Sequence, residues 1–253
     1  MARLTLALVL CVFLAGCVTV DPNQHSNGKA FDSIEASEAR IALGLSYLEV
    51  GQWQRARKNL DQALAYAPKY YRAQNAMAYY YQKVDEGDKA EAMYKRALKD
   101  SPKNGDVRNN YGVFLCGQER YDEAIDAFER AIKQPYYYLT SASYENAGLC
   151  RLKQGENEEA VFYFERALAH DPQRARSLLQ LAQLNIASNN YKDARVLLFT
   201  FNKRYGYKAD SLSLLIQLEQ QSGRLTQAEK YVDLLQEQFP DSQQYQNYLA
   251  NED

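Results

Sequence analysis

Hydrophobic and small residues recur along most of the chain in a unit of 34 to 36 residues. Each unit contains an alanine, and the six alanines align at Ala56, Ala90, Ala124, Ala160, Ala194 and Ala228. A large side chain follows four residues later, at Leu60, Tyr94, Phe128, Phe164, Leu198 and Val232. In the first four units another small residue comes three places further on, at Ala63, Ala97, Ala131 and Ala167. Spacings of four and three place these side chains on one face of a helix.

A second helix precedes this one in each unit. It carries a small residue where its partner crosses, at Gly44, Ala78, Gly112, Gly148 and Ala182. Gly or Asn marks the turn between the two helices, and Pro68, Pro102, Pro172 and Pro240 close four of the units. Proline ends a helix because it lacks the amide donor. The pattern therefore predicts six pairs of helices, each closely packed through small residues.

A helix pair with a period of 34 residues resembles the tetratricopeptide repeat. One pair cannot bury its apolar face alone, so we expect the six repeats to stack into an all-α solenoid over residues 37–240. Residues 241–253 would then cap the last repeat. Such repeats indicate binding of a partner, and they specify no chemistry by themselves.

The N-terminus has a different pattern. After Met1-Ala2-Arg3, residues 4–14 are apolar and Leu14-Ala15-Gly16-Cys17 follows. A short basic start and a short apolar stretch are typical of a secretory signal peptide. The last four residues resemble the signal of bacterial lipoproteins, which implies cleavage after residue 16 and acylation of Cys17. The alternatives are an ordinary cleaved signal or a buried first helix.

Residues 17–36 are predicted to form a flexible, lipidated tether, since they hold Pro22, Asn27 and Gly28 with little hydrophobic periodicity. The resemblance implies three acyl chains on Cys17, and two or more hold a protein stably on a membrane. Residue 18 is Val and not Asp, so the inner-membrane retention signal is absent. We therefore expect the protein to be anchored at the periplasmic face of the outer membrane.

Composition excludes several functions. The formal net charge is −2, so the chain has no basic field for nucleic acid. With only two histidines, no metal-ligand spacing and no glycine-rich phosphate loop, the sequence predicts no enzyme, no cofactor, no metal and no small-molecule substrate.

Cys116 and Cys150 fall in the first helices of the third and fourth repeats. In an oxidising periplasm a disulfide between them is allowed. It would stabilise the fold by about 3–4 kcal/mol through loop closure. Two buried free thiols are the alternative, whereas redox catalysis is disfavoured because no Cys-x-x-Cys is present.

Two stretches are more particular than the general repeat: residues 109–116, Asn-Asn-Tyr-Gly-Val-Phe-Leu-Cys, and residues 144–150, Tyr-Glu-Asn-Ala-Gly-Leu-Cys. Between them lies a two-residue insert with Pro135 and the tyrosines 136–138. With the six repeats and Cys17, these motifs resemble the PilF/PilW family of type IV pilus pilotins. The resemblance implies a lipoprotein that helps the secretin, the ring through which the pilus exits, to reach the outer membrane and multimerise.

The expected partner site is the groove lined by the first helices. Ile41, Leu45 and Leu48 form an apolar stripe at its first repeat, and Tyr79 follows in the second. An exposed apolar stripe is typical of an interaction site. Alternatively, residues 30–36 fold over the stripe as a cap.

Two other functions fit a repeat lipoprotein. One is an adaptor that recruits a periplasmic protease or a cell-wall hydrolase. The other is a subunit of the outer-membrane β-barrel assembly machinery. The paired cysteine motifs and the number of repeats favour the secretin assembly factor.

Overall fold

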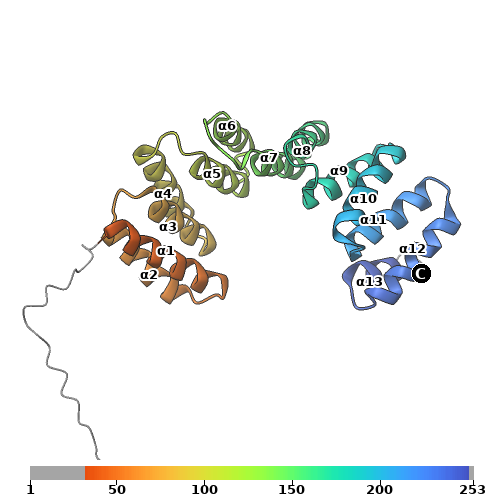
Figure 1. Cartoon of the computed structure of the whole chain (residues 1–253), viewed down its shortest axis with the longest axis horizontal. Helices are drawn as coiled ribbons and strands as arrows, with labels where there is room; N and C mark the ends of the chain where they lie inside the picture. Colours follow the sequence, from red (N-terminus) through yellow and green to blue (C-terminus); the bar gives the residue numbers. More distant parts are fainter. Residues whose placement is uncertain (1–31, 251–253) are drawn as a thin grey trace, which may run out of the picture.

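The structure, a computed structural model, describes residues 32–250, and over these residues it contains helices and no strand (Figure 1). The helices are α1 (Ser33–Glu49), α2 (Trp53–Tyr66), α3 (Tyr71–Lys83), α4 (Gly87–Asp100), α5 (Gly105–Gly117), α6 (Tyr121–Ile132), α7 (Thr140–Gln154), α8 (Asn157–His170), α9 (Ala175–Ala187), α10 (Tyr191–Tyr205), α11 (Ala209–Gln221), α12 (Leu225–Gln238) and α13 (Gln243–Ala250).

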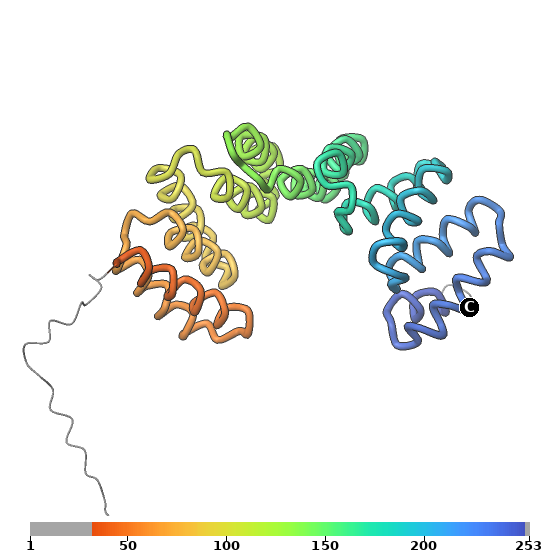
Figure 2. The backbone as a smooth tube through the Cα atoms, viewed as in Figure 1, coloured from red at the N-terminus to blue at the C-terminus, as the bar shows by residue number. Residues whose placement is uncertain are grey.

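Successive helices pair as hairpins, from α1 with α2 to α11 with α12, and the pairs follow one another along an arc (Figure 2). The first helices of neighbouring repeats pack side by side, as α1 does with α3, α3 with α5 and α5 with α7. The predicted all-α solenoid of six tetratricopeptide repeats is confirmed.

Small residues in the first helices make room for the large residues of the second helices. A Cβ atom on Gly112 would lie 2.7 Å from the ring of Phe128, and one on Gly148 would lie 2.8 Å from the ring of Phe164. Both rings are completely buried. The two glycines thus allow each aromatic ring to pack directly against the backbone of the facing helix.

We expect Gly112→Ala to lower the free energy of unfolding by about 1–3 kcal/mol, because the new methyl overpacks the contact with Phe128. Gly117→Ala is the matched control in the same helix, since a Cβ atom there meets nothing within 4 Å. Denaturant unfolding of the two variants checks this. Equal stability for both would mean that Phe128 moves aside without cost.

Two predicted boundaries can be compared with the helices. Helix α1 begins at Ser33, where the Asp32 side chain accepts hydrogen bonds from the N–H groups of Ile34 and Glu35. Helix α1 therefore begins before residue 37 and includes the last residues of the predicted tether, because Asp32 is an N-cap. At the other end α13 packs against α11, inside the predicted capping segment. The signal peptide, Cys17 and most of the predicted tether lie outside the described residues.

Candidate functional site: the groove of the first four repeats

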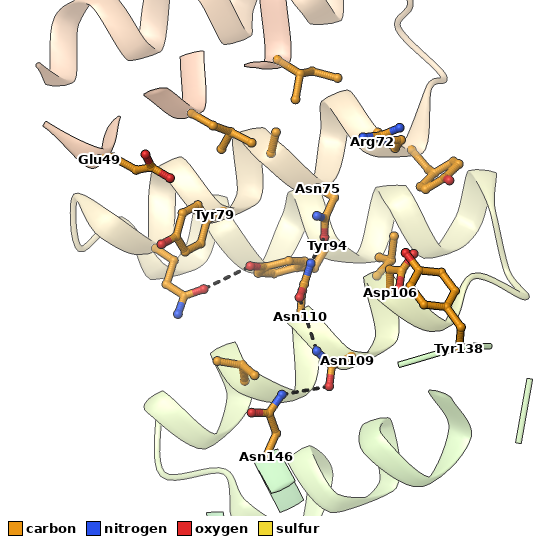
Figure 3. Close-up of a pocket in the computed structure, with 17 residues that line it drawn as sticks. Glu49, Arg72, Asn75, Tyr79, Tyr94, Asp106, Asn109, Asn110, Tyr138 and Asn146 are labelled. Carbon is orange, nitrogen blue, oxygen red and sulfur yellow. Dashed lines mark hydrogen bonds between the residues drawn. The ribbon is translucent and has the colours of Figure 1, made fainter. Parts of the chain in front are cut away.

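A groove of about 720 Å³ runs across the first helices of the first four repeats (Figure 3). Polar and aromatic side chains dominate its surface. The lining residues are Ile41, Leu45 and Glu49 of α1; Tyr71, Arg72, Asn75, Ala76, Tyr79 and Gln82 of α3; Tyr94 of α4; Asp106, Val107, Asn109, Asn110 and Val113 of α5; Tyr138 of the insert; and Asn146 of α7.

Four asparagines connect the helices across the groove floor. The Nδ2 atom of Asn146 donates to Oδ1 of Asn109 at 3.0 Å, and Nδ2 of Asn110 donates to Oδ1 of Asn75 at 3.3 Å. A longer bond of 3.5 Å joins Asn109 to Asn110. Ser143 also donates to Asn109 Oδ1, at 2.8 Å. This asparagine chain, defined as Asn75, Asn109, Asn110 and Asn146, therefore spans α3, α5 and α7 (Figure 3).

The apolar stripe of α1 divides into core and groove. Ile41 and Leu48 are each only 5% exposed and belong to one hydrophobic cluster with Ala76 and Met77 of α3. The prediction that they form an exposed seat is wrong, because both are buried in this cluster, although Ile41 also borders the groove. Leu45 is half-buried in the groove wall, and Tyr79 is exposed in the groove.

The insert between α6 and α7 shapes the far side of the groove. Tyr137 packs over Gly105, where a Cβ atom would lie only 2.4 Å from its ring, and its hydroxyl lies 2.7 Å from that of Ser143. Burial raises the pKa of Tyr137 to about 12. Its neighbours Tyr136 and Tyr138 are exposed, and Tyr138 lines the groove together with Asp106 (Figure 3).

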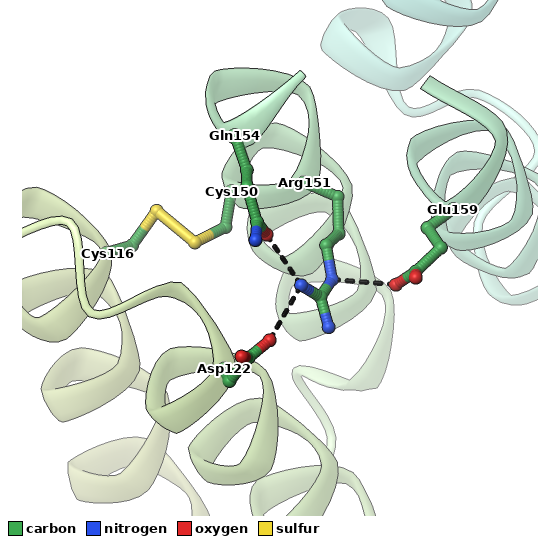
Figure 4. The surroundings of a disulfide bond; sticks show 6 residues. All are labelled: Cys116, Asp122, Cys150, Arg151, Gln154 and Glu159. Atoms are coloured by element: carbon green, nitrogen blue, oxygen red, sulfur yellow. Dashed lines mark hydrogen bonds and ion pairs between the residues drawn. A yellow bond between two sulfur atoms is a disulfide. The ribbon is translucent and has the colours of Figure 1, made fainter. Parts of the chain in front are cut away.

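A disulfide between Cys116 and Cys150 ties α5 to α7 next to the groove, with the Cα atoms 5.8 Å apart (Figure 4). Beside it, the Arg151 guanidinium forms ion pairs with Asp122 at 2.9 Å and with Glu159 at 2.7 Å. These charges come from α6 and α8, so Arg151 links three consecutive helices. The third and fourth repeats are thereby joined by covalent and ionic contacts.

The sequence predicted Leu45 and Tyr79 at the groove, and the structure places both in its lining. The sequence did not predict Asn110 and Asn146, which occupy equivalent positions 36 residues apart in the third and fourth repeats. A signal was present, since Asn75 and Asn109 stand 34 residues apart and the quoted motifs contain the other two asparagines.

Within residues 32–250 no three His, Cys, Asp or Glu side chains are grouped so that they could hold a metal ion. Over the same residues no helix is long and apolar enough to cross a membrane. The groove offers amide, hydroxyl, carboxylate and aromatic groups, which suit the recognition of a polypeptide.

Comparison with known proteins defines the class first. Three models described as tetratricopeptide repeat match residues 41–83, 105–173 and 151–206. A solved tetratricopeptide-repeat protein, YrrB, shares the fold with a TM-score of 0.59 at 17% identity. The chain is a tetratricopeptide-repeat protein, a scaffold for protein interactions.

More similar relatives narrow the class to a family. The chain is 34% identical to the type IV pilus assembly protein PilF of Pseudomonas aeruginosa, over 98% of both lengths. A solved structure of P. aeruginosa PilF matches with a TM-score of 0.73 at 33% identity, covering 87% of this chain and 99% of that one. A crystal structure of PilW, a type IV pilus biogenesis factor, matches with a TM-score of 0.73 at 30% identity, covering 84% and 98%. The chain belongs to the PilF/PilW family, whose members are non-enzymatic scaffolds.

Proposed function

We propose that this protein takes part in type IV pilus assembly as a pilotin, a lipid-anchored factor that binds the secretin and promotes its multimerisation in the outer membrane. The observation that carries the proposal is the 34% identity to P. aeruginosa PilF over 98% of both lengths. The groove of the first four repeats is the proposed binding site.

The groove chemistry supports binding of an extended polypeptide segment. Each asparagine amide carries an NH2 donor group and an acceptor oxygen, so it can pair with the C=O and N–H groups of a partner main chain. The amides in the asparagine chain already hold one another in place across three helices. Leu45 and Tyr79 add an apolar contact at one end of the groove.

Deletion of the gene, followed by immunoblotting for heat-resistant secretin multimers, tests the proposal. We expect the multimers to be lost and a plasmid copy to restore them. Unchanged multimers together with failed recruitment of a protease or hydrolase would reject the pilotin function in favour of an adaptor.

The proposed anchor is Cys17. We expect Cys17→Ser to abolish fatty-acid labelling and to move the protein into the soluble fraction, because the acyl chains provide the membrane affinity. Circular dichroism should remain that of a helical protein. A Cys17→Ser protein that stays with the membrane would show that another segment anchors it.

Leu45→Glu tests the groove. A carboxylate at this half-buried position of the wall opposes an apolar partner residue, so we expect secretin binding to fall at least tenfold, or about 1.4 kcal/mol. Pull-down of the secretin and a melting curve on the same variant measure the two effects.

Leu43→Glu is the matched control, since Leu43 lies on the same helix, is 40% exposed and does not line the groove. It should leave binding unchanged. A loss of about 2 kcal/mol of stability in Leu45→Glu, alongside the lost binding, would identify Leu45 as core and count against the groove.

A further inference from the structure

The groove continues beyond the asparagine chain. Asn146 lines both the groove and a second hollow of about 740 Å³, which lies between α7 and the segment that leads into α9. The end of α10 closes this second hollow with Arg204 and Tyr205. An extended segment that follows the asparagine chain therefore passes from one hollow into the other.

The groove of the first four repeats has uncompensated negative charge. Glu49 and Asp106 line it, and among the described residues neither has an ion-pair partner. Its one arginine, Arg72, is paired with Glu38 at 3.0 Å. The Oδ1 atom of Asp106 is buried and accepts no hydrogen bond. The exposed ring of Tyr138 lines the same groove (Figure 3).

The second hollow has an excess of positive charge. Arg176 and Arg204 are exposed there and have no ion-pair partner among residues 32–250. Arg174 is engaged, since its Nε lies 3.0 Å from the buried carboxylate of Glu145. Asp171 offsets one positive charge, and its Oδ1 already accepts the N–H of Gln173. One positive charge therefore remains in excess.

We infer that the two hollows bind one extended segment of the partner with polarised charge, a Lys or Arg beside Asp106 and Tyr138 and an Asp or Glu beside Arg176 and Arg204. A basic side chain at the first position gains a carboxylate and an aromatic face. An acidic side chain at the second gains guanidinium groups. Because reversed charges would be repelled at both ends, the arrangement selects one direction of the bound segment. This inference rests on the proposed function only in that the segment belongs to the bound partner.

Selection from a displayed library of random 12-residue peptides, with the full chain purified in detergent, tests the inference. We expect the selected peptides to contain a basic and an acidic residue at a constant spacing and in a constant order. Affinity for a selected peptide should fall at least tenfold in the Arg176→Glu, Arg204→Glu double variant, and it should weaken as salt is raised.

Two variants test the first hollow by itself, and a third variant is a control for net charge. Tyr138→Ala removes an 81% exposed ring, so it should weaken binding without affecting folding, and Asp106→Asn should remove the preference for a basic residue. The control is Lys99→Glu with Lys192→Glu, which reverses two exposed charges outside both hollows and should leave affinity unchanged. If the control lost as much affinity for the peptide as the double arginine variant, the change in net charge would explain both losses and the inference would be overturned.

The peptide selection tests the inference independently of the secretin assay. Polarised peptides with unchanged secretin multimers on deletion would support the inference and reject the secretin as partner. Selected peptides without a charge preference, or no selected peptide at all, would overturn the inference and leave the multimer result to decide the function.

Discussion

Replacing Arg195 by Met is expected to lower the free energy of unfolding by about 3–5 kcal/mol, because it leaves a buried carboxylate without its main partner. Glu219 of α11 is only 2% exposed, and Arg195 of α10 binds both of its oxygens at 2.9 Å. Arg224 lies farther away, at 3.4 Å, and is itself half exposed. Because Arg224 still attracts the Glu219 carboxylate in the variant, we expect a loss of stability near the lower end of this range.

The loss of stability in Arg195→Met should depend on pH. Burial alone raises the pKa of Glu219, but the hydrogen-bonded guanidinium of Arg195 outweighs it and holds the pKa below its usual 4.5. A lowered pKa in the folded state stabilises the protein above the unfolded pKa, and this stability is lost as the pH falls. In Arg195→Met the carboxylate protonates more readily. The difference in unfolding free energy between variant and parent should therefore begin to narrow as the pH falls to the pKa of Glu219 in the variant, which lies above that in the parent.

Urea unfolding of both proteins between pH 3 and pH 8 measures this. Arg130→Met is the matched control, since the ion pair of Arg130 with Asp126 is exposed on both sides and should contribute less than about 1 kcal/mol. The double variant Arg195→Met, Glu219→Gln should recover part of the loss, because no charge is then buried alone. If Arg195→Met loses no more stability than Arg130→Met, the Glu219 carboxylate is hydrated in solution.

The sequence predicted the architecture well because the repeat is encoded redundantly. Six copies of the same small and large positions indicate one helix pair, and a departure in one copy, such as Gly206 in place of Pro, does not obscure the others. The contact of Gly112 with Phe128 and that of Gly148 with Phe164 are the same contact in successive repeats. A periodic pattern thus specifies the packing within each unit.

Contacts between units were harder to predict. Ile41 and Leu48 have the spacing of a surface stripe, yet both are buried, whereas Leu45 on the same helix is half-buried in the groove wall. The asparagine chain likewise depends on how far the insert shifts α7 relative to α5. Side chains that meet across repeats depend on the superhelical geometry, which no single repeat encodes.

The start of the first helix was missed for a local reason. Asp32 caps α1 by accepting two main-chain N–H groups, and a capping Asp in a polar segment resembles any other polar residue until the helix is seen.

The Cys116→Ser, Cys150→Ser double variant is expected to lose about 3–4 kcal/mol of unfolding free energy, since the bridge closes a loop between residues 34 apart. Thiol counting on denatured, unreduced protein should find no free thiol from this pair. Reducing agent should lower the melting temperature of the parent and leave that of the double variant unchanged. Two free thiols in the parent would contradict the bridge and leave the pair as buried core.

The bridge should also affect the groove. It fixes α5 against α7, and the bond from Asn146 to Asn109 crosses the same pair of helices. Gly112→Ala provides a destabilised comparison with the bridge intact. If the bridge positions the asparagines, the double serine variant should bind the secretin more weakly than Gly112→Ala under conditions where both are fully folded. Equal binding by the two variants would assign the disulfide a role in stability alone.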